Sequence, residues 1–119
     1  MRARPSRPNS TARTGSAGFG VNDVVNCLVL TACIAEAEAM RYTPAGIPAL
    51  NLKLEHVSRV VEAGQARDVN AAVKAVAFGS LAEQLVKQAP GSVFCFKGFV
   101  ATPRNGRHVV FHIQELSKD

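Results

Sequence analysis

The stretch Arg41–His56, RYTPAGIPALNLKLEH, contains a turn followed by a strand in which apolar and polar residues alternate. It is the starting point for predicting the fold. Its Thr43-Pro44-Ala45-Gly46 segment has proline at the second place and glycine at the fourth, as a type I turn prefers. After the turn, side chains alternate with the period of two that a strand imposes, namely Leu50, Leu52, Leu54 and His56 against Asn51, Lys53 and Glu55. This alternation predicts a strand over residues 47–56 with one leucine-bearing face.

Four further runs rich in β-branched and aromatic residues predict strands over residues 26–34, 67–78, 92–102 and 107–116. In the last run Val109, Phe111 and Ile113 alternate with His108, Val110 and His112. The segment 62–65 predicts one hairpin connection, and Asn105-Gly106 predicts a hairpin turn before the last strand.

A short helix is predicted between the third and fourth strands. Ser80 and Glu83 have the spacing of a capping box, Lys87 suits the C-terminal end of a helix, and Pro90-Gly91 stops it. Five strands with one helix in this position form the order of an OB-fold, a Greek-key barrel. The fold class is therefore all-β with one short helix, and a five-stranded OB barrel is favoured over an open five-stranded sheet.

Length and composition indicate one domain. The chain has 119 residues, 47% of them apolar, and contains no apolar run of the ~20 residues that would span a bilayer. Its three cysteines form no C-x-x-C pair, so a disulfide framework and a zinc knuckle are not indicated, and a reducing cytoplasm is expected. Residues 24–119 hold ten Lys and Arg against eight Asp and Glu, so this part has a net charge of only +2.

Residues 1–24 have a different composition from the rest. They are rich in Arg, Ser, Gly and Pro, and the first 23 residues hold four arginines against Asp23. Two interpretations stay open, a disordered basic leader or an upstream start wrongly assigned. In both cases the OB domain is expected over residues 25–117.

Several short motifs occur in order between Asn26 and about Leu116. They are Asn26-x-Leu-Val-Leu-Thr-Ala32, Thr43-Pro-Ala-Gly-Ile-Pro48, Leu54-Glu-His-x-Ser58, Glu62-Ala-Gly64, Gly98-Phe99, Asn105-Gly106 and Phe111-His112. Together they resemble the primosomal replication protein N family, also called the primosomal protein B family, which is related to single-stranded DNA-binding protein. The turn motif followed by L-E-H-x-S is the most specific pair.

The resemblance implies a homodimer of OB-folds in the bacterial cytoplasm that binds single-stranded DNA. It also implies that the protein stimulates a restart helicase at stalled forks and helps to recruit the factor that reloads the replicative helicase. No catalysis and no cofactor are implied. Familiar members carry stacking aromatics at the positions of Gln65 and Asn70 and a basic residue at that of Val57, so we expect weaker or more salt-sensitive DNA binding here.

The candidate contacts to DNA are basic residues. They lie in or beside the expected loops 41–48, 62–67 and 103–107, and on the strands between these loops. Each of them could also be an ordinary solvated side chain. Tyr42 could stack on a base or pack over its loop, and most strand phenylalanines are expected in the core, although one or two could lie on a binding face. The candidate residues are Arg41, Tyr42, Lys53, Arg59, Arg67, Lys97, Arg104 and Arg107.

No nucleophile motif, phosphate-binding glycine pattern or Cys/His/Asp grouping occurs, so an enzyme is not expected. His108 and His112 lie four residues apart in a predicted strand, about 13 Å, which is too far for one metal ion. An alternative function is a protein adaptor of the primosome with weak DNA binding. An ordinary single-strand-binding protein is a third option, although the chain lacks the long acidic-tipped tail of such proteins.

Overall fold

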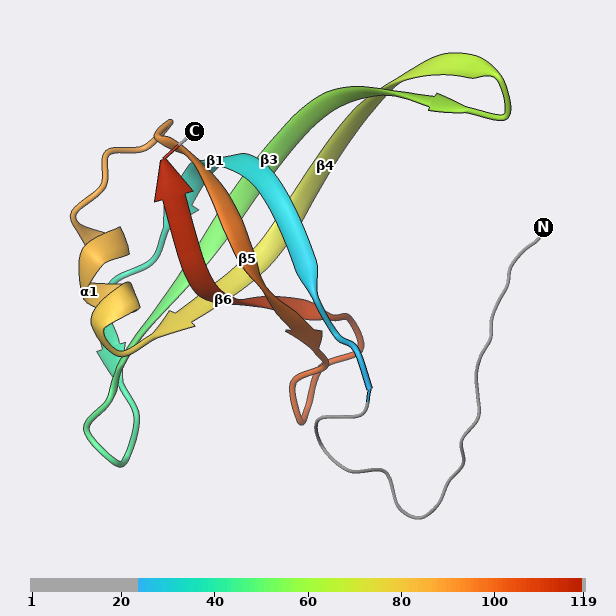
Figure 1. The fold of residues 1–119 in the computed structure, drawn as a ribbon. Coiled ribbons are helices and arrows are strands. Elements are labelled where there is room, and N and C mark those ends of the chain that lie inside the picture. Colours follow the sequence, from blue (N-terminus) through green and yellow to red (C-terminus); the bar gives the residue numbers. More distant parts are fainter. Residues whose placement is uncertain (1–23, 119) are drawn as a thin grey trace.

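The computed structural model describes residues 24–118 and consists of six strands and one helix (Figure 1). The predicted leader, residues 1–24, lies outside the described residues except for Val24. Within the described part, no helix has the length and hydropathy needed to span a bilayer. The elements are β1 Leu28–Ala37, β2 Arg41–Tyr42, β3 Pro48–Glu62, β4 Gln65–Phe78, α1 Ser80–Val86, β5 Val93–Ala101 and β6 Val110–Lys118.

Five of the strands close into a barrel, as predicted. Strand β1 pairs with β5 through its first half and with β3 through its second half, and the register shifts between Ile34 and Glu36 where it changes partner. The ring continues from β5 to β6, from β6 to β4 by a short parallel contact, and from β4 back to β3. The two-residue strand β2, which was not predicted, pairs with the start of β3.

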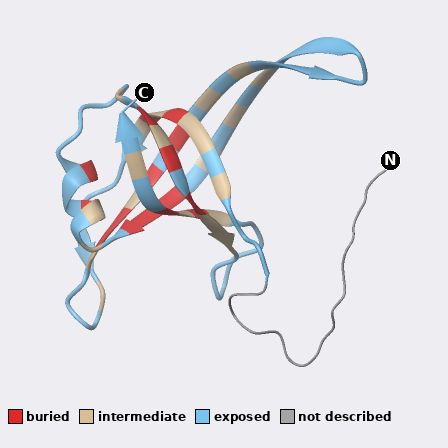
Figure 2. Ribbon diagram, viewed as in Figure 1, coloured by how far each residue is buried: buried red, intermediate tan, exposed pale blue. Residues whose placement is uncertain are grey.

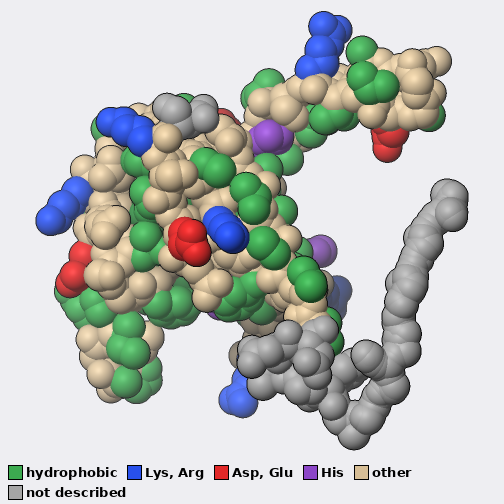
Figure 3. All heavy atoms as spheres, in the orientation of Figure 1, with side chains coloured by type: hydrophobic (Ala, Val, Ile, Leu, Met, Phe, Trp, Pro, Cys, Tyr) green, Lys and Arg blue, Asp and Glu red, His purple; other side chains and the backbone are tan. Residues whose placement is uncertain are grey.

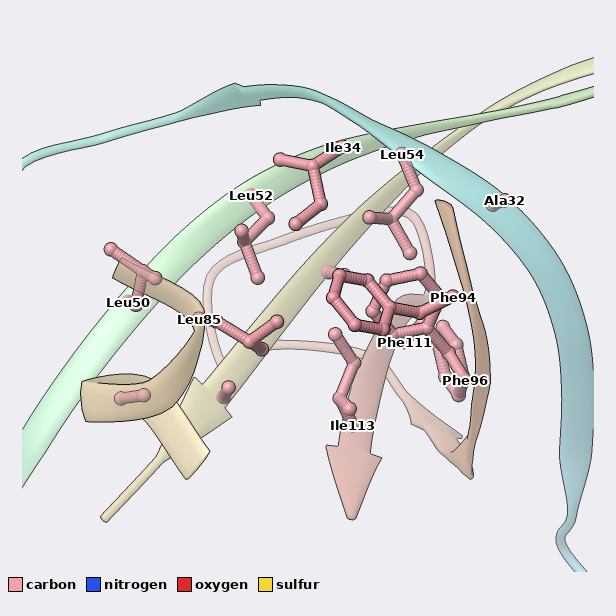
Figure 4. Packing of buried hydrophobic residues seen from close by; sticks show 13 residues of the cluster. Ala32, Ile34, Leu50, Leu52, Leu54, Leu85, Phe94, Phe96, Phe111 and Ile113 are labelled. Carbon is pink, nitrogen blue, oxygen red and sulfur yellow. The ribbon is translucent and has the colours of Figure 1, made fainter. Parts of the chain in front are cut away.

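The barrel interior is filled by alternate residues of its strands (Figures 2 and 4). Leu50, Leu52 and Leu54 are all buried, which confirms the leucine face expected for β3. Phe96 and Phe111 are the largest fully buried side chains, and the predicted assignment of most strand phenylalanines to the core is correct for them. Burying such side chains contributes roughly 1.5–3 kcal/mol each relative to leaving them in water.

The helix α1 covers one end of the barrel through Ala82 and Leu85, which are both buried (Figure 4). The predicted capping box is wrong. Gly79, with a φ of 72°, is the N-cap, and its carbonyl accepts the first helical hydrogen bond from the Glu83 N–H at 3.3 Å. Because Ser80 already lies inside the helix, its hydroxyl cannot act as a cap and no side-chain cap is formed.

The β3–β4 hairpin is much longer than predicted. Strand β3 does not end at His56 but continues to Glu62, and fourteen residue pairs join it to β4. Ala63 and Gly64 both have positive φ, 54° and 79°, as a two-residue type I′ turn requires, so the predicted hairpin connection is confirmed. Residues 57–70, here called the arm, project from the barrel as a two-stranded ribbon (Figure 1).

The two predicted turns differ in outcome. At Thr43–Gly46 the Gly46 N–H donates to the Thr43 carbonyl at 2.7 Å, so the turn is confirmed. At the other site the hydrogen-bonded turn spans Pro103–Gly106, where the Gly106 N–H donates to the Pro103 carbonyl at 3.0 Å. Gly106 does not have positive φ, so the tight Asn-Gly hairpin turn is replaced by the eight-residue loop 102–109.

This loop also displaces the start of the last strand. Strand β6 begins at Val110, so His108 and Val109 lie in the loop, and Val109 is exposed rather than on the buried face. Phe111 and Ile113 are buried as the alternation predicted. The N-terminal strand likewise lies later than expected and runs to Ala37, because β1 needs its second half to pair with β3.

Gly98 allows β5 and β6 to approach each other at a register shift in their pairing. A Cβ atom added at Gly98 would overlap the carbonyl oxygen of His112, which belongs to the backbone of the neighbouring strand and cannot rotate away. We therefore expect Gly98→Ala to lower the free energy of unfolding by roughly 3 kcal/mol or more, as strained core substitutions do. Urea denaturation followed by circular dichroism measures this loss.

Gly46→Ala is the matched control, because its added Cβ meets no atom within 4 Å and only its φ of 84° is unfavourable. That conformation costs about 1–2 kcal/mol. If the two variants lose equal stability, the close approach of the strands at Gly98 does not limit the fold.

Candidate nucleic-acid interface

A cleft of about 730 Å³ lies on the outer face of β3 and β4. The ends of β1 and β2 form one wall, and the loop 102–109 and the start of β6 form the other. The lining residues are Glu36, Glu38, Arg41, Asn51, Leu52, Lys53, Ala72, Val73, Lys74, Ala75, Val76, Phe78, Pro103, Val110 and His112. An OB-fold uses the same sheet face and flanking loops to hold oligonucleotides.

One row of charged side chains crosses the cleft floor. Glu36 of β1 is in register with Lys53 of β3, which in turn lies opposite Lys74 of β4. Like charges directly opposite each other on adjacent strands destabilise a sheet. Neither lysine forms an ion pair within residues 24–118. The two lysines therefore lie opposite each other on adjacent strands, and both are exposed and available to an anionic ligand.

A second row is organised by Asn51. The Arg41 guanidinium donates to Asn51 Oδ1 at 3.1 Å, and Asn51 Nδ2 donates to Glu38 Oε1 at 3.4 Å. The Glu38 backbone N–H also donates to the Asn51 carbonyl at 2.9 Å. Asn51 thus holds a cation and a carboxylate side by side on the same wall of the cleft.

Three rings form an aromatic strip, defined as Phe78, His112 and Phe99. The His112 ring stacks on Phe99 with centroids 4.7 Å apart and on Phe78 with centroids 6.0 Å apart. Burial lowers the pKa of His112 below its ordinary value of 6.5, because the charged imidazolium would lose hydration there. The imidazole is therefore neutral near pH 7 and lies between the rings of Phe99 on β5 and Phe78 on β4, and Phe78, at 42% exposure, is the ring most open to a ligand.

The loop 102–109 carries Arg104 and Arg107, which are both exposed, and its Pro103 lines the cleft. The Asn26 side chain fixes the chain beside this loop, since its amide donates to the Val100 carbonyl at 2.8 Å and accepts from the Val100 N–H at 3.0 Å. Two exposed arginines therefore lie beside one wall of the cleft. The loop that carries them follows directly after the part of β5 that Asn26 holds by hydrogen bonds.

Six of the eight predicted contact residues fall into two groups. Arg41 and Lys53 line the cleft, and Arg104 and Arg107 lie in the loop that borders it. Tyr42 is 65% exposed but does not line the cleft, and Lys97 lies on β5 opposite Val29 and Glu115. The structure thus gathers the first group and leaves the second on other surfaces.

Arg59 and Arg67 belong to neither surface, because both lie on the arm. Arg59 pairs with Asp68 at 3.2 Å and Arg67 pairs with Glu62 at 2.9 Å. Six residues separate Arg59 from Lys53 along β3, about 20 Å of extended chain. These two arginines are locally neutralised and distant from the cleft.

Sequence reasoning missed Lys74, Phe78 and His112 as members of the cleft. The period of two along β4 could have indicated the first two, since Lys74 and Phe78 are four residues apart and therefore lie on the same face, opposite to that of Ala75 and Ala77. His56 is a half-buried, hydrogen-bonded residue of the barrel. Its ring contacts the Thr31 carbonyl oxygen and the Ser58 hydroxyl at 2.6 and 2.7 Å.

Among residues 24–118 there is no group of three or more side chains with the donor atoms to hold a metal ion. The three cysteines are free, Cys27 exposed and the other two half-buried. The cleft lining contains cationic, anionic, aromatic and amide side chains.

Comparison with known proteins gives consistent matches over nearly the whole described chain. A family model described as another single-strand binding protein family matches residues 26–115. The replication restart protein PriB of Bordetella pertussis is 45% identical over 95 residues, which cover 79% of this chain and 89% of that protein. PriB of Nitrosomonas europaea is 31% identical over 91 residues, covering 76% and 84%.

Solved structures agree with these matches. The PriB structure from Ralstonia solanacearum has a TM-score of 0.74 and 40% identity, and the match covers 80% of this chain and 98% of that one. The single-stranded DNA binding protein of Thermus aquaticus has a TM-score of 0.64 at 22% identity, covering 78% of this chain and 49% of that one, and supports the fold alone.

The lowered pKa of His112 makes stability depend on pH. In the unfolded chain the imidazole takes up a proton near its ordinary pKa of 6.5, whereas the folded protein resists protonation. Acidification from about pH 7 to about pH 5 should therefore favour the unfolded state. Thermal unfolding of wild type and His112→Phe across this range measures the effect.

The phenylalanine variant keeps a ring for stacking but cannot titrate, so its stability should fall less on acidification. His56 and His108 are present in both proteins and cancel in the difference. Identical pH dependence of the two proteins would contradict the burial of His112 as the cause.

Proposed function

This chain belongs to the replication restart protein PriB family, and we propose that it binds single-stranded DNA along the β3–β4 cleft. The motifs that resembled the primosomal replication protein N family pointed to the same family, so the resemblance is confirmed. The proposed role is that of an accessory protein in replication restart, without catalysis of its own.

The observation that carries the DNA site is the pairing of Lys53 with Lys74 beside the aromatic strip. Phosphates need cations in a row, and unstacked bases need flat apolar surfaces. His112 lies one strand across from Lys74 and two residues along, about 8 Å away, and Phe78 lies four residues beyond Lys74 on β4, about 13 Å away. Arg104 and Arg107 extend the cationic surface beyond the cleft wall, so the strand would continue over loop 102–109.

The net charge of the cleft itself is small, because Arg41, Lys53 and Lys74 face Glu36 and Glu38. The balance of three cations and two carboxylates is +1. Gln65 and Asn70, in place of the aromatics of familiar relatives, lie on the arm and add no stacking surface there. Affinity would then depend on Phe78, His112 and Phe99, together with a few phosphate contacts.

Charge removal in the cleft tests the site. Lys53→Gln/Lys74→Gln should weaken binding of a single-stranded 30-mer and lower the slope of log affinity against log salt by about 1.4, since each phosphate contact contributes about 0.7 on single strands. Fluorescence anisotropy over a salt series gives both quantities.

Arg59→Gln/Arg67→Gln removes the same charge from the arm and is the matched control. Because those arginines are neutralised by Asp68 and Glu62, the slope should change much less. Equal losses in the two double variants would place the DNA elsewhere than the cleft.

Membership of this family also supports a more specific role. We propose a homodimer in the bacterial cytoplasm that binds single-stranded DNA at stalled forks, stimulates the restart helicase and helps to recruit the factor that reloads the replicative helicase. In this arrangement the cleft holds the strand while another surface contacts the proteins. DNA-dependent stimulation of the helicase by the full chain, lost in Lys53→Gln/Lys74→Gln, would support it.

The arm favours a second role as a protein adaptor. Val57 and Val61 are 75% and 76% exposed, and Arg59, Arg67, Glu62 and Asp68 cancel one another in charge. Figure 3 shows hydrophobic side chains along this ribbon, together with basic and acidic side chains. A neutral apolar ribbon is unsuited to tracking phosphates, but exposed valines of this kind are typical of protein contacts.

Val57→Thr/Val61→Thr separates the two roles, because threonine keeps the β-branched shape while removing apolar surface. We expect DNA affinity to stay unchanged and the affinity for the restart helicase to fall by about tenfold, as loss of two buried methyl groups predicts. Anisotropy and pull-down titration measure the two. A fall in DNA affinity with intact helicase binding would reverse the assignment.

A further inference from the structure

The Asn51 side chain joins an arginine and a glutamate on one wall of the cleft. The Arg41 guanidinium donates to Asn51 Oδ1 at 3.1 Å, and Asn51 Nδ2 donates to Glu38 Oε1 at 3.4 Å. All three residues line the cleft. A guanidinium can only donate hydrogen bonds and a carboxylate can only accept them. The residue that bonds both must therefore carry a donor and an acceptor, as the amide of Asn51 does.

Arg41 and Glu38 share this partner but do not pair with each other. Both ion pairs found within residues 24–118 lie on the arm. Opposite charges on neighbouring exposed side chains attract each other, and the attraction is stronger near a protein surface than in bulk water. Because the Asn51 amide bonds each of them separately, the positive charge of Arg41 is not neutralised by the carboxylate.

The backbone fixes Asn51 in this position. Its carbonyl oxygen accepts a hydrogen bond from the Glu38 N–H at 2.9 Å, and the residue lies opposite Val76 in the β3–β4 register. Asn51 is half-buried, whereas Arg41 and Glu38 are exposed. The amide is thus the most enclosed of the three side chains, and the guanidinium above it is open to a ligand.

Arg41 in this position extends the cationic part of the cleft. Lys53 lies two residues beyond Asn51 on β3, about 7 Å away, and Lys74 lies opposite Lys53. A guanidinium has five N–H donors in a planar fork that matches the geometry of a phosphate. The hydrogen bond to Asn51 uses one of them, so the others can bind a phosphate beside those held by the lysines.

We propose that Asn51 is a positioning residue that keeps Arg41 from pairing with Glu38, so that the guanidinium stays free to bind a phosphate of single-stranded DNA. This inference rests on the proposed function, since it assigns a role to Asn51 within the same site. Asn51 acts through Arg41 and needs no contact with DNA. Without its amide, Arg41 would pair with Glu38 and be neutralised, as the two arginines of the arm are.

Asn51→Val removes the amide and introduces a residue that suits a strand. Arg41 should then pair with Glu38, and the slope of log affinity for a labelled single-stranded 30-mer against log salt should fall by about 0.7, which is one phosphate contact. Asn51→Val/Glu38→Gln also removes the competing carboxylate, so this variant should regain the wild-type slope. Fluorescence anisotropy of the full-length variants over a salt series measures these slopes.

Asn70→Val makes the same exchange on the arm, opposite Val57, and should leave the slope unchanged. An unchanged slope in Asn51→Val, with Lys53→Gln/Lys74→Gln still lowering it, would overturn this inference alone. A lowered slope that Glu38→Gln does not restore would overturn it as well, because pairing with Glu38 would not be the cause. If Lys53→Gln/Lys74→Gln leaves the slope unchanged, the proposed function fails and this inference fails with it.

Discussion

The antiparallel pairing of β3 with β4 is the constraint on which the rest of the molecule depends. Fourteen residue pairs run without a register shift from Ala49 opposite Phe78 to Glu62 opposite Gln65. Because side chains alternate between faces, one register places the leucines inside the barrel and Lys53 beside Lys74 outside it. A slip by one residue would exchange the two faces, so the core and the cleft are determined by the same set of hydrogen bonds.

The same pair of strands carries two different surfaces, the cleft near the barrel and the arm beyond it. Near the barrel, β1 and β6 flank the pair, and loops and strand ends enclose the cleft. Beyond Val57 no other strand of residues 24–118 accompanies it, and a two-stranded ribbon alone has little stability in water. The arm therefore depends on the barrel for its order and exposes valines where the cleft exposes lysines. Nucleic acid and protein contacts can thus occupy different parts of one hairpin.

Much of the fold could be predicted because it depends on local patterns. The alternation in residues 50–54 indicated the buried face of β3, Thr43–Gly46 indicated its turn, and the order of elements indicated an OB barrel. The predictions that were wrong involved competition between local signals and tertiary contacts. Ser80 has a capping motif, but the chain enters the helix through Gly79, and Asn105-Gly106 has a hairpin signal, but the hydrogen bond closes at Pro103.

By itself the sequence determined the alternation of side chains along the strands, the positions of turns and the chemistry of the side chains. These features depend on neighbours within a few residues. Only the tertiary structure decided which of those side chains meet. Glu36, Lys53 and Lys74 come from three strands, and Phe78, His112 and Phe99 come from three, and closure of the barrel brings both sets to one face. It also decided that Arg59 and Arg67 pair with carboxylates on the arm, because β3 continues past His56 to Glu62 and brings these side chains together across the hairpin.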